Sequence, residues 1–255
     1  MCVLAFAWQA HPRWRLVMAG NRDELHARPT AALARWDQPD HLLAGRDLQS
    51  GGTWLGVSEQ GRFAVVTNLR GYGGPVPDRA SRGELVVDLL AGEGRYADVN
   101  EAQLSDFNPF NLIVAGHDRA RFLSNRPEPV EAALAPGIYG LSNGALDEPW
   151  PKTMRLKEIL LEWIVDGATH PESLFAGLRE EAQPDVGVRP ASPSDVPQEP
   201  ALSSIFIHNP VYGTRCSSVV AIDNRGNGRI IERRFTPEGD VAGETLLSFS
   251  WPLAG

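Results

Sequence analysis

The N-terminal quarter of the chain alternates short apolar runs with turn-forming residues, a pattern typical of antiparallel strands. Residues 3–8 and 16–19 are apolar and flank a segment containing Pro12, so they predict a hairpin. Residues 53–58 and 62–68 form a second pair of apolar runs around a short turn that contains glycine. We therefore expect this part of the chain to be mostly antiparallel sheet.

A helical period of apolar residues follows. Residues 81–90 begin with Ser81, three positions before Glu84, which is the spacing of a helix-capping box. The predicted apolar face of this helix consists of Leu85, Val86, Leu89 and Leu90. A longer helix is expected from Pro151 to Gly167, and a short one around residues 171–181.

The remaining segments return to strand patterns. Residues 109–116 and 119–125 predict another hairpin, and four more strands are expected at 203–209, 216–222, 228–235 and 244–251. Residues 184–200 contain five prolines and few apolar residues, so we interpret them as a loop, either a surface excursion or a flap over a site. The order of strands, helices and strands predicts one α+β domain over residues 1–255, with helices layered on antiparallel sheets.

Composition narrows the classes of partner. The chain has 255 residues, 42% of them hydrophobic, and a net charge of −8. Nucleic acids and anionic membranes are bound through basic surfaces, so this charge argues against both partners. No apolar run approaches the ~20 residues of a membrane span. The two cysteines form no CxxC pair, which fits a reducing, cytoplasmic location, and the six histidines show no HxH or HExxH spacing, so no metal site is expected.

Cys2 is the first residue with evident chemistry. A small side chain at position 2 permits removal of Met1, which would leave a thiol and an α-amine on one residue. The ordinary pKa of an α-amine is ~7.7–8.0, so the amine can accept the thiol proton near neutral pH. The alternative is that Cys2 is a small core residue that begins a strand.

Polar residues at the end of the second predicted strand bear on these alternatives. The hairpin places residues near Asn21 opposite Cys2, and Asn21 is followed by Arg22, Asp23 and Glu24. This polar group could form turn ion pairs with His26 and Arg28. It could instead form a charged shell that orients the Cys2 amine and lowers the pKa of the thiol.

Six segments carry a resemblance to a known family. They are NRDE at 21–24, GGTWLG at 51–56, VTNLR at 66–70, NPFNLIV at 108–114, LSNGALDEPWPK at 141–152 and YGTRCSSV at 212–219. In this order, and over essentially the whole chain, they resemble the NRDE-motif family, which contains the transport and Golgi organisation two proteins. That family is similar to the cysteine N-terminal-nucleophile hydrolases of the penicillin V acylase and bile salt hydrolase branch. The resemblance implies a four-layer αββα sandwich of two antiparallel sheets.

The resemblance also assigns roles to particular residues. It implies Cys2 as nucleophile and Asp23 as the carboxylate that holds the freed amine. Asn68 and Asn143 resemble the asparagines of an oxyanion site, where an amide can donate a hydrogen bond without carrying a charge. Arg215 resembles a late arginine near the thiol.

One position departs from the hydrolase branch. That branch has arginine two residues before Arg22, where this chain has Gly20. The residues expected to contact substrate are Asn21, Arg22, Trp54 and Tyr72. For the two aromatic residues, packing in the core is the alternative.

Three functions remain open at this point. The first is hydrolysis of an amide bond in a small acylated substrate, with no cofactor. The second is binding or trafficking of haem or another lipophilic cargo on the same scaffold without hydrolysis, in which case a haem would need an axial ligand. The third is a glutamine amidotransferase domain, which shares the N-terminal cysteine but usually continues with a CGI-like sequence instead of CVLAF.

Overall fold

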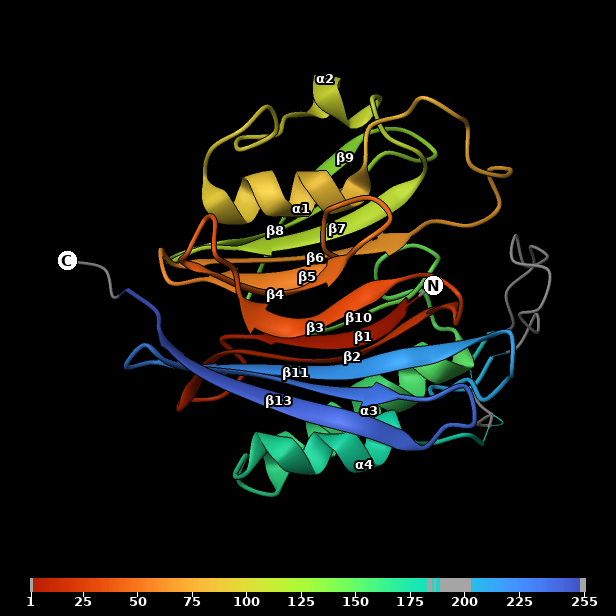
Figure 1. The fold of residues 1–255 in the computed structure, drawn as a ribbon. Helices are drawn as coiled ribbons and strands as arrows, with labels where there is room; N and C mark the ends of the chain where they lie inside the picture. Colours follow the sequence, from red (N-terminus) through yellow and green to blue (C-terminus); the bar gives the residue numbers. More distant parts are fainter. Residues whose placement is uncertain (1, 183–184, 186, 189–202, 253–255) are drawn as a thin grey trace.

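Two antiparallel sheets form the centre of the protein (Figure 1). The computed structural model describes residues 2–182, 185, 187–188 and 203–252, so most of the proline-rich segment 184–200 lies outside the described residues. One sheet has the strand order β10-β1-β2-β11-β12-β13. Its strands are β10 (Gly137–Leu141), β1 (Cys2–Trp8), β2 (Trp14–Leu25), β11 (Tyr212–Asp223), β12 (Asn227–Phe235) and β13 (Val241–Ser250).

The second sheet has seven strands in sequential order. They are β3 (Thr30–Arg35), β4 (Leu42–Asp47), β5 (Leu55–Ser58), β6 (Arg62–Asn68), β7 (Phe110–Ala115), β8 (Ala120–Ser124) and β9 (Val130–Leu134). The helices are α1 (Arg82–Ala91), α2 (Glu101–Leu104), α3 (Pro151–Val165) and α4 (Leu174–Leu178), with a 3₁₀ turn at Pro171–Ser173. None of the helices in the described ranges is long and apolar enough to cross a membrane.

Helices cover the outer faces of both sheets. Helix α1 packs on the seven-stranded sheet, and α3 and α4 pack on the six-stranded sheet (Figure 1). A third apolar cluster joins the inner faces, where the rings of Phe6 and Phe63 stack with centroids 5.6 Å apart. The expected four-layer αββα sandwich is therefore confirmed.

Strand β1 explains why the N-terminal apolar run is continuous. All seven of its residues are buried, because Leu4 and Phe6 face the other sheet while Val3 and Ala5 face α3. A strand covered on both faces has no solvent side that would call for polar residues. The predicted hairpin is confirmed, with β1 and β2 paired antiparallel.

Most other predicted elements are confirmed as well. Ser81 caps α1 by accepting a hydrogen bond from the Glu84 backbone amide at 3.3 Å, and Gly92 ends the helix in the left-handed conformation. The predicted strand at 203–209 is wrong. That segment is irregular, because the amide of Phe206 bonds to Glu180 beyond α4 and the amide of Ile207 bonds to the Thr214 side chain, so no ladder forms.

Candidate active site

The β1–β2 hairpin and strand β11 bring two cysteines to the same region of one sheet. Cys2 pairs with Arg22, and Arg22 pairs on its other side with Cys216. Cys2 is 6% exposed and begins its strand next to the turn that follows β10. The Ser142 hydroxyl in that turn donates a hydrogen bond to the Cys2 carbonyl at 2.9 Å, which fixes the backbone of the predicted nucleophile.

A cavity of about 370 Å³ opens beside Cys2 and is lined by residues of both sheets. Most of the predicted site residues contribute to its lining. Those residues are Cys2, Arg22, Asp23, Trp54, Asn68 and Arg215. The fold therefore gathers one region from segments as distant as residues 2 and 215.

Asp23 is held by its neighbours on β11. It is 1% exposed, its Oδ1 accepts a hydrogen bond from the Thr214 hydroxyl at 2.7 Å, and its carbonyl accepts one from the Tyr212 hydroxyl at 3.0 Å. Burial raises the pKa of Asp23, while the charge of Lys152 and the bond from Thr214 act in the opposite direction. This carboxyl group is consequently rigid and placed within electrostatic range of the Cys2 thiol.

Lys152 is a site neighbour that the sequence did not single out. It lies in the first turn of α3, is 3% exposed and donates to the Ser203 hydroxyl at 2.7 Å. Burial lowers the pKa of Lys152 to about 8, while the negative charge of Asp23 acts to raise it. The sequence analysis did not predict its burial, although Lys152 lies four residues before the buried Leu156 on the same helix.

The thiol itself is not activated by its surroundings in this structure. Burial raises the pKa of Cys2, and the guanidinium of Arg22 acts in the opposite direction. Burial also raises the pKa of Cys216, and Glu232 adds to this effect.

The two predicted oxyanion asparagines have different environments. Asn68 ends β6 and lines the cavity, and among the described residues no acceptor takes a hydrogen bond from its side-chain amide. Asn143 is fully buried, donates from Nδ2 to the Asn68 carbonyl at 2.8 Å and lines a second cavity instead. Asn68 thus lines the cavity of Cys2 with a side-chain amide that no described residue engages, whereas Asn143 holds the backbone of Asn68.

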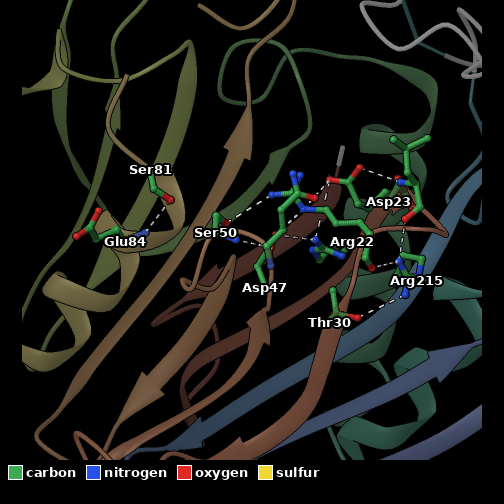
Figure 2. A network of polar contacts seen from close by, with 12 residues as sticks. Arg22, Asp23, Thr30, Asp47, Ser50, Ser81, Glu84 and Arg215 are labelled. Carbon is green, nitrogen blue, oxygen red and sulfur yellow. Dashed lines mark hydrogen bonds and ion pairs between the residues drawn. The ribbon is translucent and has the colours of Figure 1, made fainter. Parts of the chain in front are cut away.

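An ion-pair network forms one wall of the cavity (Figure 2). Asp47 accepts a hydrogen bond from Nε of Arg28 at 2.6 Å and lies 3.4 Å from Nη2 of Arg22. Burial acts to raise the pKa of Asp47, but the bond and charge of Arg28 together with the bonds from the backbone amides of Ser50 and Gln49 outweigh it, and the pKa is lowered. Arg215 donates to the carbonyls of Leu25 and Arg28, at 2.8 and 2.9 Å, and so anchors the segment after β2.

Two residues expected to contact substrate lie outside this cavity. Asn21 is fully buried and faces the helical layer that contains α4. Its side-chain amide donates hydrogen bonds to the carbonyls of Leu178 and Ile205, at 2.8 Å each. Tyr72 is 43% exposed and lines the second cavity, of about 390 Å³, with Asn143. The structure does bring Arg22 and Trp54 into the first cavity.

Further lining residues were not identified from the sequence. Arg82, Asp47, Cys216 and Glu232 all belong to the first cavity. Because Arg82 follows the predicted Ser81 cap, the sequence places it at the start of a helix. The sequence does not show that this end of the helix approaches Cys2. Within the described part of the chain, no group of three or more His, Cys, Asp or Glu side chains is placed to hold a metal ion.

The sequence of this chain is similar to a known family and to members of it from two mammals. Residues 1–237 match the family described as Transport and Golgi organisation 2. The chain is 34% identical to the Transport and Golgi organization protein 2 homolog of Bos taurus, over 96% of this chain and 97% of the relative. It is also 34% identical to the homolog of Homo sapiens, over 91% of this chain and 92% of the relative.

Two solved structures share the fold. The N-acylethanolamine-hydrolyzing acid amidase ortholog of Caenorhabditis elegans superposes with a TM-score of 0.51 at 14% identity, covering 86% of this chain and 92% of that one. The C2A mutant of conjugated bile acid hydrolase from Clostridium perfringens also gives 0.51, at 9% identity, covering 100% of this chain and 98% of that one. Both are N-terminal-nucleophile hydrolases, so the expected relationship in fold is confirmed.

Proposed function

The chain belongs to the Transport and Golgi organisation 2 family and has the N-terminal-nucleophile hydrolase fold, and from this premise we propose that it hydrolyses an amide bond of a small acylated substrate. The observation that carries the proposal is the meeting of Cys2 and Asn68 at one cavity. A nucleophile and an uncommitted amide donor from different sheets are what acyl transfer requires. The two fold relatives are named as hydrolases of an N-acylethanolamine and of conjugated bile acids, which supports the same reaction class.

The proposed reaction begins once Met1 is removed. The α-amine of Cys2 takes the thiol proton, and the thiolate attacks the carbonyl carbon of the amide. Asn68 donates a hydrogen bond to the oxygen that becomes negative. The C–N bond then breaks as the α-ammonium returns the proton to the leaving amine, which leaves a thioester on Cys2.

Water completes the cycle. The α-amine removes a proton from a water molecule that attacks the thioester, and the acyl group leaves as a carboxylic acid while the thiol is restored. Asp23 acts as a positioning residue in this scheme. Its carboxyl group is fixed by Thr214 and holds the ammonium form of the amine in place.

The test uses protein from which Met1 has been removed, as verified by its intact mass. N-hexanoylethanolamine and N-hexanoylglycine serve as substrates, and the released amine is measured. We expect turnover, together with a hexanoyl adduct that peptide mapping locates at Cys2. The Cys2→Ala variant should lose both signals.

A matched control separates the thiol from the amine. Insertion of a glutamate between Met1 and Cys2 blocks removal of the methionine, so the thiol remains but its residue carries no free amine. This chain should not turn over substrate. Turnover that survives either change would contradict the proposed mechanism.

A second candidate function is binding of a lipophilic cargo, and the second cavity favours it. Its lining is largely apolar, with Leu69, Phe122, Val130, Leu146 and Trp150 among its residues. Tyr72 is the residue of that lining with a side chain suited to ligate haem iron, whereas the first cavity offers Cys2 and Cys216.

Titration with haemin tests this candidate. A saturable Soret shift that Tyr72→Phe abolishes and Cys2→Ala leaves intact would support cargo binding in the second cavity. A titration without a saturable shift would count against it.

A further inference from the structure

The cavity beside Cys2 has a charge opposite to that of the whole chain. The protein carries a net charge of −8, but seven arginines line this cavity against four carboxyl groups. The arginines are Arg22, Arg28, Arg46, Arg79, Arg82, Arg215 and Arg234, and the carboxyl groups are Asp23, Glu24, Asp47 and Glu232. Such a concentration of positive charge in a concave site attracts anions.

The carboxyl groups already have partners on the cavity wall. Asp47 binds Arg28 and lies next to Arg22. Glu232 is buried, accepts a hydrogen bond from the Leu33 amide at 2.8 Å and lies 3.8 Å from Nε of Arg234. These two acids therefore balance the arginines beside them, and Glu24 lies 4.0 Å from Arg22 and 3.9 Å from Arg28.

Arg82 lines the same cavity from the first position of α1. Its Nη1 donates to the Pro109 carbonyl at 2.9 Å, which orients the guanidinium without neutralising it. No carboxylate of the described residues lies within 4.0 Å of it. Burial lowers the pKa of Arg82, and the negative form of the Cys2 thiol acts in the opposite direction, so the guanidinium is close enough to sense the nucleophile.

Two other arginines of the cavity are less available. Arg22 is paired with Asp47, with Nη2 and Oδ2 3.4 Å apart. Arg215 donates to two backbone carbonyls and lies 3.4 Å from the Thr30 hydroxyl, so its fork is engaged by the protein (Figure 2). Arg82 lines the cavity and uses one of its donors, and no other acceptor among the described residues takes a hydrogen bond from its guanidinium.

We infer that Arg82 is a specificity-determining residue that binds an anionic group of the substrate, a carboxylate, sulfonate or phosphate, beside the amide that Cys2 attacks. A guanidinium binds such groups through paired hydrogen bonds, and partial burial strengthens them. That the bound anion belongs to a substrate rests on the proposed hydrolase function, whereas anion binding at Arg82 can be tested without turnover.

Alkylation of Cys2 by a matched pair of reagents provides the test. Iodoacetate and iodoacetamide both react by displacement of iodide as the thiolate forms an S–C bond, and they differ in charge. Peptide mapping gives the rate at Cys2 for each reagent. The ratio of the two rates cancels any change in the pKa of the thiol, since both reagents need the same thiolate.

We expect Arg82→Gln to lower the iodoacetate-to-iodoacetamide ratio by about tenfold, as loss of a charge-assisted hydrogen bond would. Arg62→Gln is the matched control. Arg62 also donates to carbonyls of α1, those of Leu90 and Ala91, but lies outside the cavity lining, so its variant should keep the wild-type ratio.

A protection experiment adds a second measurement. N-hexanoylglycine should slow alkylation of wild-type Cys2 by iodoacetamide more than neutral N-hexanoylethanolamine does, and Arg82→Gln should remove that difference. Equal ratios in wild type and Arg82→Gln, or a Cys2 that neither reagent reaches, would overturn the inference. Hydrolysis of both amides with an unchanged ratio would sustain the hydrolase proposal and reject the anion site.

Discussion

Cys2 and Asn68 line one cavity from opposite sheets, Cys2 as the first residue of β1 and Asn68 as the last residue of β6. Neither residue depends on a mobile loop for its place, because each is the end of a hydrogen-bonded strand. A site built in this way is preorganised, which is the condition for electrostatic stabilisation of a transition state.

Replacement of Asn68 by alanine should lower kcat without loss of stability. Its side-chain amide makes no hydrogen bond with the described residues, so truncation removes no native contact of that group. If it holds the oxyanion, kcat should fall about 10²–10³-fold, or ~2.7–4 kcal/mol of transition-state stabilisation. Steady-state kinetics on N-hexanoylglycine and a thermal melt give both readouts, and an unchanged kcat would remove Asn68 from the mechanism.

Asn143→Ala should have the opposite signature. Asn143 is fully buried and its Nδ2 bonds to the Asn68 carbonyl, so the variant leaves that carbonyl unsatisfied. We expect a loss of about 1–3 kcal/mol in the free energy of unfolding, measured by chemical denaturation. A variant with wild-type stability and greatly reduced kcat would instead indicate direct contact with substrate.

Gly20→Ala should destabilise the fold. A Cβ at Gly20 would lie 2.8 Å from Leu4 Cβ and 2.9 Å from the Val3 carbonyl oxygen, on the adjacent strand β1. Overpacking of this kind costs about 1–3 kcal/mol. Gly116→Ala is the control, since its added Cβ would meet only the Gly61 carbonyl at 4.0 Å. Equal denaturation midpoints for the two variants would contradict this reasoning.

The same contact explains the departure from the hydrolase branch. An arginine at position 20 would need space that Leu4 already fills. The cavity receives its β2 guanidinium from Arg22 instead, which faces Cys2 and Cys216 across the ladder.

Lys152 should give stability a distinct pH dependence. Its pKa is about 8 in the folded protein and 10.5 ordinarily, so between these values the unfolded chain binds more protons. The free energy of unfolding therefore gains a contribution that rises with pH, at most about 1.4 kcal/mol per pH unit.

Lys152→Met should lack this contribution. The difference in free energy of unfolding, wild type minus variant, is expected to increase from about pH 8 to about pH 9.5 by roughly 1.6 kcal/mol. Urea denaturation at a series of pH values measures it. Lys157→Met, on the same helix, is the control for removal of a lysine. A flat difference for Lys152→Met would show that this side chain keeps its proton when folded.

Much of the fold was readable from local patterns. The β1–β2 hairpin and the α1 cap at Ser81 follow from apolar periodicity and turn residues in adjacent sequence. Residues 30–35 and 130–134 were not predicted as strands, because β3 and β9 are sheet edges with mostly exposed side chains and little alternation. The segment at 203–209 was predicted wrongly because it is buried and apolar without ladder bonds.

The candidate site was readable only in part. Motif resemblance located Cys2, Asp23, Asn68 and Arg215, which the structure brings to one cavity, but their roles stay predictions. The order of the motifs could not show that Asn21 faces α4 or that Asn143 lines another cavity. The side of a sheet on which a side chain lies depends on the register of its strand. Arg82 and Lys152 come from helix ends that approach Cys2 only after the layers pack.

The position of β1 inside its sheet has a consequence for synthesis. Strand β1, which begins at Cys2, lies between β10 and β2, and β2 pairs in turn with β11. At ~5–20 residues per second, about ten to forty seconds of translation separate Cys2 from Arg215. The sheet that encloses the Cys2 thiol is therefore complete only after β11 has been synthesised, and until then this thiol has only part of its sheet around it.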